Sequence, residues 1–114
     1  MSPRPLAAGK LSEVAPVFAA LGDATRLRIV ARLCDGGPQP TVRFTKGASL
    51  TRQGITKHLR ALEDAGLVRS GHVGRECIWR LQPNRLTEVR RYLEQISSEW
   101  DRSLERLRAS VEDP

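Results

Sequence analysis

The chain of 114 residues has few cysteines, few aromatic side chains and no long apolar run. Its two cysteines, Cys34 and Cys77, are too few for a disulfide-bonded scaffold and too isolated for a zinc cluster. The longest apolar run covers residues 14–21, includes Pro16 and is far too short to cross a bilayer. The N-terminus also lacks the apolar segment of a secretory signal. We therefore expect a cytoplasmic protein that spans no membrane.

Signatures of catalysis are missing as well. The sequence contains no nucleophile paired with a base, no phosphate-binding loop and no cluster of metal ligands. At this length the chain has room for one domain with a single core. We expect neither an enzyme nor a protein with a cofactor.

Acidic residues are absent from residues 41–60, a stretch that carries five cations. The whole chain has 19 Lys and Arg against 13 Asp and Glu, a net charge of +6, so most of the excess lies in this stretch. Most of the cations in the chain are arginines, whose planar guanidinium suits phosphate and guanine. Such a block favours nucleic acid as a partner over a merely solvated face. Because aromatics make up only 4% of the chain, recognition of single strands by base stacking is disfavoured.

The first third of the chain predicts a tail and two helices. Residues 1–9 are rich in proline and small residues and are expected to form a flexible tail. A helix over 11–21 follows from apolar residues that recur every three or four positions. Asp23 is placed to cap a second helix over 24–34. Its predicted apolar side consists of Leu27, Val30, Ala31 and Cys34, which makes Cys34 a core residue.

The middle of the chain predicts a short strand, a helix and a hairpin. Residues 35–40 break the second helix, and the β-branched and aromatic residues of 41–46 suggest a strand although the stretch is short. Thr51 is a good N-cap for a helix that ends at about Ala65, before Gly66. Two alternating segments, 67–72 and 75–81 around Val73-Gly74, predict a β-hairpin.

The last helix carries an apolar stripe with charged residues elsewhere. It is expected to start at Pro83-Asn84 with Asn84 as its cap. The stripe repeats at steps of three and four residues and is close to a coiled-coil seam: Leu86, Val89, Leu93, Ile96, Trp100, Leu104, Leu107 and Val111. Because the small domain cannot cover a helix roughly 35 Å long, a partner chain is expected to bury its far end.

A helix pair followed by a β-hairpin is the order of a winged helix-turn-helix. With Ile55, Leu59 and Leu62 in the core, five polar residues project from the opposite side of the same helix: Arg52, Gln53, Thr56, Lys57 and Arg60. Arg52 and Gln53 lie in the first turn, where a recognition helix enters the major groove. There Arg can read guanine and Gln can read adenine. Arg75 at the hairpin tip can enter the adjacent minor groove.

Two motifs resemble the arsenical-resistance (ArsR-type) winged-helix repressors. Residues 20–30, ALGDATRLRIV, look like the opening of that family, and residues 51–68, TRQGITKHLRALEDAGLV, resemble its recognition helix and exit. Gly74-Arg75-Glu76 is similar to the tip of its wing. The resemblance covers roughly residues 11–112. It implies a homodimeric transcriptional repressor that binds an operator of two half-sites, with the first and last helices forming the dimer interface.

The sequence thus predicts a fold, domain limits and two sets of site residues. We expect a mainly α fold with a small β-hairpin wing, in which the DNA-binding domain spans 10–83 and a dimerisation helix spans 84–112. The candidate contacts to double-stranded DNA are Arg43, Lys46, Thr51, Arg52, Gln53, Thr56, Lys57, His58, Arg60 and Arg75. The candidate interface of the homodimer consists of Leu11, Val14, Phe18, Leu93, Ile96, Trp100, Leu104 and Leu107.

The chain departs from the metal-sensing members that it resembles. Residues 41–46 lack the Cys-x-Cys pair that those members carry before the recognition helix, and the last helix has no histidine. Carboxylates alone suit zinc or soft metals poorly, so we expect no metal site. Two alternatives stay open: a winged-helix module for protein interaction, and a repressor that senses oxidants through Cys34 and Cys77.

Overall fold

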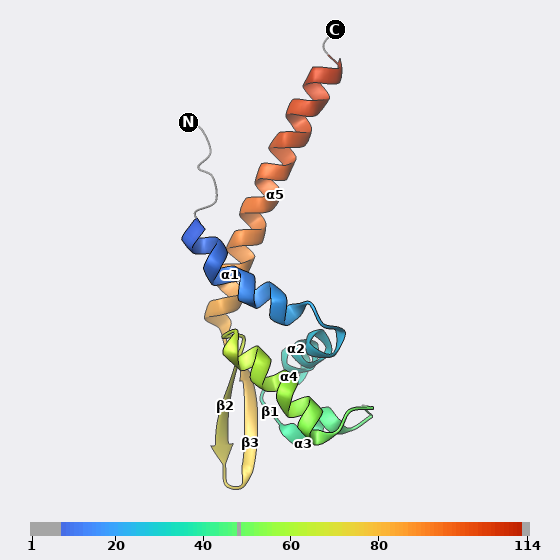
Figure 1. The fold of residues 1–114 in the computed structure, drawn as a ribbon, viewed down its shortest axis with the longest axis vertical. Coiled ribbons are helices and arrows are strands. Elements are labelled where there is room, and N and C mark those ends of the chain that lie inside the picture. The colour runs from blue at the N-terminus through green and yellow to red at the C-terminus, as the bar shows by residue number, and fades with distance from the viewer. Residues whose placement is uncertain (1–7, 48, 113–114) are drawn as a thin grey trace.

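A computed structural model describes residues 8–47 and 49–112 of the chain. It confirms a mainly α fold with a small antiparallel sheet and a long last helix (Figure 1). The elements in chain order are α1 (Ala8–Leu21), α2 (Ala24–Gly36), β1 (Gln39–Pro40), α3 (Thr41–Thr45), α4 (Arg52–Asp64), β2 (Val68–Val73), β3 (Glu76–Leu81) and α5 (Pro83–Glu112). Of the predicted tail, Ala8 and Gly9 belong to α1, and residues 1–7 lie outside the described part. None of the described helices is long and apolar enough to span a membrane.

Residues 41–45 form a helix, so the strand suggested for 41–46 is wrong. Thr41 and Phe44 lie three residues apart and are both buried, which requires one helical turn rather than alternation. The Trp79 indole Nε1 donates a 2.9 Å hydrogen bond to the Thr41 hydroxyl and ties the start of α3 to the sheet. The strand lies just before it, since Gln39 and Pro40 pair with Trp79 and Ile78. The sheet order is β1-β3-β2.

Helix α4 begins and ends at the predicted residues. The Thr51 hydroxyl accepts a hydrogen bond from the Gly54 amide at 3.1 Å. At the other end the Leu67 amide donates to the Leu62 carbonyl and the Gly66 amide donates to the Glu63 carbonyl. This pair of bonds is a Schellman motif, and it requires the φ of +80° that Gly66 adopts. Asn84 is not a cap, because α5 already begins at Pro83.

The hairpin turn lies one residue later than the sequence predicts. Val73 still belongs to β2 and pairs with Glu76, so the turn consists of Gly74 and Arg75. Gly74 has a φ of +63°, which suits the first position of a tight hairpin turn. The wing therefore presents Arg75 at its tip.

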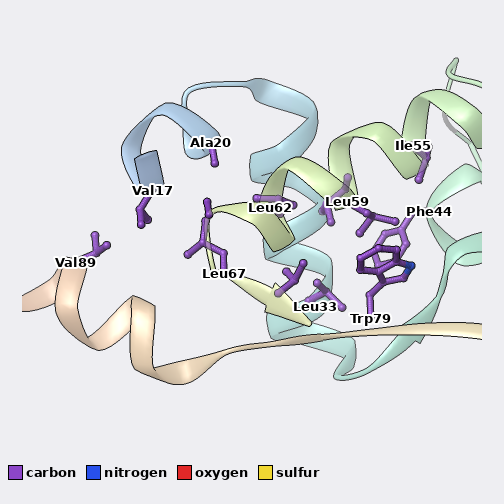
Figure 2. Packing of buried hydrophobic residues seen from close by; sticks show 13 residues of the cluster. Val17, Ala20, Leu33, Phe44, Ile55, Leu59, Leu62, Leu67, Trp79 and Val89 are labelled. Atoms are coloured by element: carbon purple, nitrogen blue, oxygen red, sulfur yellow. The ribbon is translucent and has the colours of Figure 1, made fainter. Parts of the chain in front are cut away.

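One apolar cluster joins the helices to the sheet (Figure 2). Phe44 and Trp79 lie at one end of it, and Val17 of α1 and Val89 of α5 lie at the other (Figure 2). Helix α2 contributes Ile29 and Leu33 as its buried residues, whereas Leu27 and Cys34 are exposed. Of the predicted inner side of α2, Val30 packs against the core, whereas Leu27, Ala31 and Cys34 are exposed and were wrongly placed there. The neighbouring Ile29–Leu33 pair has the same four-residue spacing and larger side chains to bury.

Candidate nucleic-acid interface

The outer side of α4 carries six of the ten predicted DNA contacts. They line one shallow, open groove: Thr51, Arg52, Gln53, Thr56, Lys57 and Arg60. The helix lies with Ile55, Leu59 and Leu62 in the core, as the apolar spacing requires. Arg52 and Lys57 are exposed and form no ion pair within the described residues. Asp64, which sequence reasoning missed, adds one carboxylate at the C-terminal end of the groove.

The two threonines of this groove are already used by the helix. The Thr51 hydroxyl caps α4, and the Thr56 hydroxyl donates to the Arg52 carbonyl at 2.8 Å. The Thr51 hydroxyl therefore stabilises the start of the helix, and both hydroxyls are already engaged with its backbone. The side chains free to contact a ligand in the first two turns are those of Arg52, Gln53 and Lys57.

Arg60 connects α4 with the wing. Its guanidinium pairs with Glu63 at 3.0 Å and lies over the Trp79 ring, 5.4 Å from the ring centroid. Glu63 also accepts hydrogen bonds from the Ser70 hydroxyl at 2.6 Å and from the Ser70 amide at 2.8 Å. The bond from the Ser70 hydroxyl is the main reason why the pKa of Glu63 lies below its usual range, and Arg60 adds to it. This set of contacts fixes the angle between the helix and β2.

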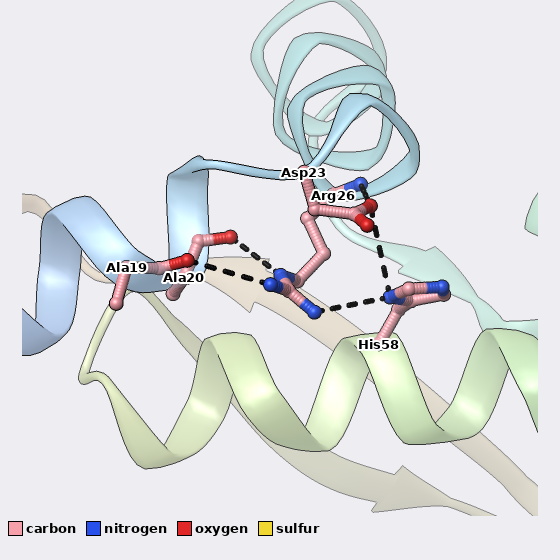
Figure 3. Close-up of polar contacts among 5 residues, drawn as sticks. All are labelled: Ala19, Ala20, Asp23, Arg26 and His58. Carbon is pink, nitrogen blue, oxygen red and sulfur yellow. Dashed lines mark hydrogen bonds and ion pairs between the residues drawn. The ribbon is translucent and has the colours of Figure 1, made fainter.

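His58 faces the protein instead of the groove (Figure 3). Its Nδ1 accepts a hydrogen bond from Arg26 Nη1 at 3.3 Å and lies 3.9 Å from Asp23 Oδ1. The Arg26 guanidinium also donates to the carbonyls of Ala19 and Ala20 at the end of α1. The Nδ1 side of His58 is therefore used inside the protein, and its predicted DNA contact stays a prediction. Position 58 lies three residues after Ile55 and four before Leu62, so it belongs to the inner stripe.

The turn before α2 is held by Asp23 as predicted. Its carboxylate accepts the Arg26 amide hydrogen bond at 3.0 Å, and this bond is the main cause of the lowered pKa of Asp23. Together with the Arg26 side chain, this cap joins the ends of α1, α2 and α4. The sequence indicated the cap but not the long-range contact to His58.

The remaining predicted cations lie away from the α4 groove. Arg75 is exposed at the wing tip. Arg43 is exposed on α3, and its carbonyl accepts a hydrogen bond from Arg32 at 3.0 Å. Lys46 lines a separate cavity together with Arg28 and Arg32 of α2. Sequence reasoning missed these two arginines, although their spacing of four residues places them on one side of α2.

A second surface is apolar and involves α1 and α5. Leu11 and Phe18 of α1 are exposed, and so is the outer part of the α5 stripe, with Trp100 at 65% and Leu107 at 62%. The first two stripe residues belong to the protomer: Val89 lies in the core and Leu86 packs against it. Ile96 is half-buried. Phe18 and Tyr92 join the two helices, with ring centroids 6.0 Å apart. Val14 is only 2% exposed, so its predicted place in the dimer interface is wrong: it packs inside the protomer.

Helix α5 extends far beyond the rest of the molecule (Figure 1). The chain measures 68 Å along its longest axis, and every residue from 100 to 112 is exposed. Ion pairs along the helix, such as Arg90–Glu94 and Arg108–Glu112, stabilise it without a neighbour. They leave the stripe from Trp100 to Val111 without a cover within the described chain.

The described residues contain no group of three His, Cys, Asp or Glu side chains that could hold a metal ion.

The chain is similar to known proteins both in its helix-turn-helix segment and over its whole fold. A family profile described as a helix-turn-helix domain matches residues 21–71. The uncharacterised HTH-type transcriptional regulator YuzN of Bacillus subtilis is 46% identical over 65 residues, which cover 52% of this chain and 71% of YuzN.

Two solved structures are similar over most of the chain. An ArsR-like transcriptional regulator from Rhodococcus sp. RHA1 is 40% identical, with a TM-score of 0.74 over 90% of this chain and 95% of that one. A homodimeric winged helix-turn-helix DNA-binding domain from Mycobacterium bovis has a TM-score of 0.64 over 87% of this chain and 92% of that one. At 22% identity the latter shows the shared fold alone.

Proposed function

Because the chain belongs to the ArsR family of helix-turn-helix transcriptional regulators, we propose that it represses transcription by binding a two-half-site operator as a homodimer. The observation that carries this proposal is the outer side of α4, where Arg52, Gln53 and Lys57 are exposed. No described carboxylate neutralises Arg52 or Lys57. A surface used only for protein assembly has no need for such unpaired cations.

The proposed roles of the α4 residues follow from their positions. Arg52 and Gln53 lie in the first turn, from which side chains reach base edges in the major groove. Lys57 lies one turn later and provides a charge for the phosphate backbone. Arg75 at the wing tip is placed for the minor groove beside it. Arg60 supports α4 against the wing and offers its remaining N–H groups to a phosphate.

The proposed dimer is formed by α1 and α5. Their exposed apolar side chains form an unusually long seam for a monomer of this size, and solvent contact with it is costly. The similar domain from Mycobacterium bovis is described as a homodimer. A two-fold dimer of this kind would place two α4 helices about one DNA turn apart, roughly 34 Å.

Neither an enzyme nor a metal sensor is favoured. The relatives named above are transcriptional regulators, which argues against a catalytic role. Cys34 is exposed and Cys77 is half-buried, and no contact between them supports an oxidant sensor. A DNA-binding regulator must be in the same compartment as the DNA, and we therefore propose a cytoplasmic location.

Selection of fragments from the source genome tests the proposal. The full chain is incubated with sheared genomic DNA, and the bound fragments are recovered and sequenced. We expect enrichment of a common inverted repeat whose half-sites are centred about 10 base pairs apart. Recovery of fragments at their input frequencies would contradict sequence-specific binding. The variant Arg52→Ala with Gln53→Ala serves as the control, since it should lose the enrichment.

A further inference from the structure

A cavity of about 300 Å³ lies between α2 and the helix-turn-helix, apart from the groove of α4. Its lining comes from α2, from α3, from the turn that follows α3 and from the first turn of α4. This volume is at the lower end of the range for small-molecule sites in proteins. Neither the groove of α4 nor the dimer seam accounts for it, although Lys46 in its lining is also a candidate DNA contact.

The rim of the cavity is cationic. Arg28, Arg32 and Lys46 line it, and Asp35 is the one carboxylate among its lining residues. Arg28 and Lys46 form no ion pair within the described chain, and Arg32 donates one hydrogen bond to the Arg43 carbonyl. The positive charge at the rim is therefore largely uncompensated. An anion that entered the cavity could form ion pairs with Arg28 and Lys46, because neither has a carboxylate partner.

The floor of the cavity is apolar. Ile29, Phe44 and Ile55 lie at its bottom, each at most 3% exposed, and the exposed methyl group of Ala31 adds apolar surface beside them. A simple anion such as phosphate would gain nothing from this floor. A ligand with both a carboxylate and an apolar body would use the rim and the floor together.

We propose that this cavity binds a small organic carboxylate, with its anionic group at Arg28 and Lys46 and its apolar part against Ile29, Phe44 and Ile55. The ligand bridges α2 and the turn that leads into α4. Provided that the proposed function holds, binding also weakens the affinity for DNA, because Lys46 is one of the candidate DNA contacts and cannot pair with both anions. The added negative charge lies beside the start of the recognition helix and repels the DNA backbone. The cavity thereby acts as an inducer site.

Carboxylate binding is measured first without DNA. The full chain is titrated with sodium benzoate, with benzyl alcohol as its uncharged analogue and with inorganic phosphate, while amide NMR signals are followed. We expect saturable shifts at Ile29, Gly47 and Ile55 with benzoate at or below millimolar concentration. Benzyl alcohol and phosphate should bind at least about tenfold more weakly. Shifts that spread over the exposed stripe of α5, or equal binding of all three compounds, would overturn the proposal.

A charge-removal variant and its control locate the site. The double variant Arg28→Gln with Lys46→Gln keeps the apolar floor and should weaken benzoate binding by at least about tenfold. Arg69→Gln removes an exposed charge from β2, outside the cavity, and should bind benzoate as the unmodified chain does. Unchanged binding by the double variant, or an equal loss in Arg69→Gln, would show that the cavity rim does not hold the carboxylate.

The regulatory effect is measured separately, by titrating a recovered DNA fragment in the presence of saturating benzoate. DNA affinity should fall by about fivefold or more in the unmodified chain and should not respond to benzoate in the double variant. Saturating benzoate that leaves DNA affinity unchanged would refute the inducer role. If no sample binds DNA at all, the proposed function fails, whereas the benzoate titration still decides on the cavity.

Discussion

Single side chains on α4 divide into those that are free and those that the protein already holds. Arg52, Gln53 and Lys57 are exposed without a charged partner in the described chain, whereas Arg60 is paired with Glu63 and covers Trp79. The sequence predicted all four as DNA contacts because they share one side of the helix. It could not predict the different partners, since Glu63, Ser70 and Trp79 meet only when the wing folds against α4.

Substitutions at Arg52 and Lys57 should have different effects on DNA binding. Arg52→Ala or Gln53→Ala should reduce discrimination at one base position in each half-site by about 1–3 kcal/mol, because a base contact is lost. Lys57→Ala should weaken binding to all sequences alike, because a phosphate contact carries no sequence information. Affinities for a set of operators with single base changes separate the two effects. Equal losses of affinity for all operators in all three variants would contradict the assignment of Arg52 and Gln53 to base contacts and of Lys57 to a phosphate contact.

The Glu63 carboxylate should make stability sensitive to acid. Its pKa is lower in the folded state than its ordinary value of 4.5, chiefly because of the Ser70 hydroxyl, so its contribution is complete above that value. The contribution is lost as the pH falls through the lower, folded-state pKa. Glu63→Gln should therefore be less stable than the unmodified chain at pH 7, with a smaller difference at about pH 3.

Urea unfolding at pH 7 and at about pH 3 measures this difference. Glu94→Gln is the matched control, because Glu94 forms an exposed ion pair with Arg90 on α5 and touches no other element by hydrogen bonding. An exposed pair contributes little, so this control should change stability by less than about 1 kcal/mol at either pH. A Glu63→Gln difference that is the same at both pH values would exclude the proposed linkage.

For helices and strands, local capping residues were sufficient to predict where a helix begins and ends. Features that depend on packing between distant residues could not be predicted. Thr51, Gly66 and Asp23 determine helix ends through bonds to residues within five positions, and a sequence shows these directly. The helicity of 41–45 depends on the distant Trp79, and the inner side of α2 depends on which residues the core admits. For that reason the predictions for α3 and Cys34 are wrong, while the capping residues of α4 are confirmed and the hairpin turn is displaced by one residue.

Two glycines of the α4 region should respond to alanine in opposite directions. Gly66→Ala should destabilise the fold by about 1–2 kcal/mol, because its φ of +80° places an L side chain in the left-handed region. Gly54→Ala should stabilise it by about 0.5–1 kcal/mol, since Gly54 lies inside α4 and an added Cβ meets only ordinary contacts at 3.5 Å or more. Thermal unfolding of both variants checks this pair. If both variants were stabilised or both destabilised, the assignment of Gly66 as the left-handed residue that ends α4 and of Gly54 as an ordinary helical residue would be contradicted.

At the scale of the whole molecule, the shape itself argues for a partner. A helix of 30 residues spans roughly 45 Å, and its second half packs against no other part of the described chain. The sequence predicted the seam from spacing alone. It could not show that Val14 is used within the protomer, because Val14 and Phe18 both lie on the apolar side of α1 and only packing distinguishes them.

Removing the far end of the seam should separate the subunits. Burial of a large aromatic side chain contributes on the order of 3 kcal/mol, and a two-fold dimer loses it on both chains. Trp100→Ala with Leu104→Ala should therefore give folded monomers at micromolar concentration in sedimentation experiments. Arg102 lies between the two positions and is not part of the stripe, so the control variant Arg102→Ala should remain a dimer. A double variant that stays dimeric would place the interface elsewhere.

Sequence-specific binding of duplex DNA by a dimer of this chain is tested by one titration. A duplex recovered from genomic selection and a shuffled duplex of the same composition are titrated over a range of salt concentrations. With roughly 6 to 10 phosphate contacts, log K for the recovered duplex should fall with log salt at a slope of about −5 to −9. At each salt concentration it should also bind at least about a thousandfold more tightly than the shuffled duplex. Equal affinity for both duplexes, or an affinity that does not depend on salt, would contradict the account.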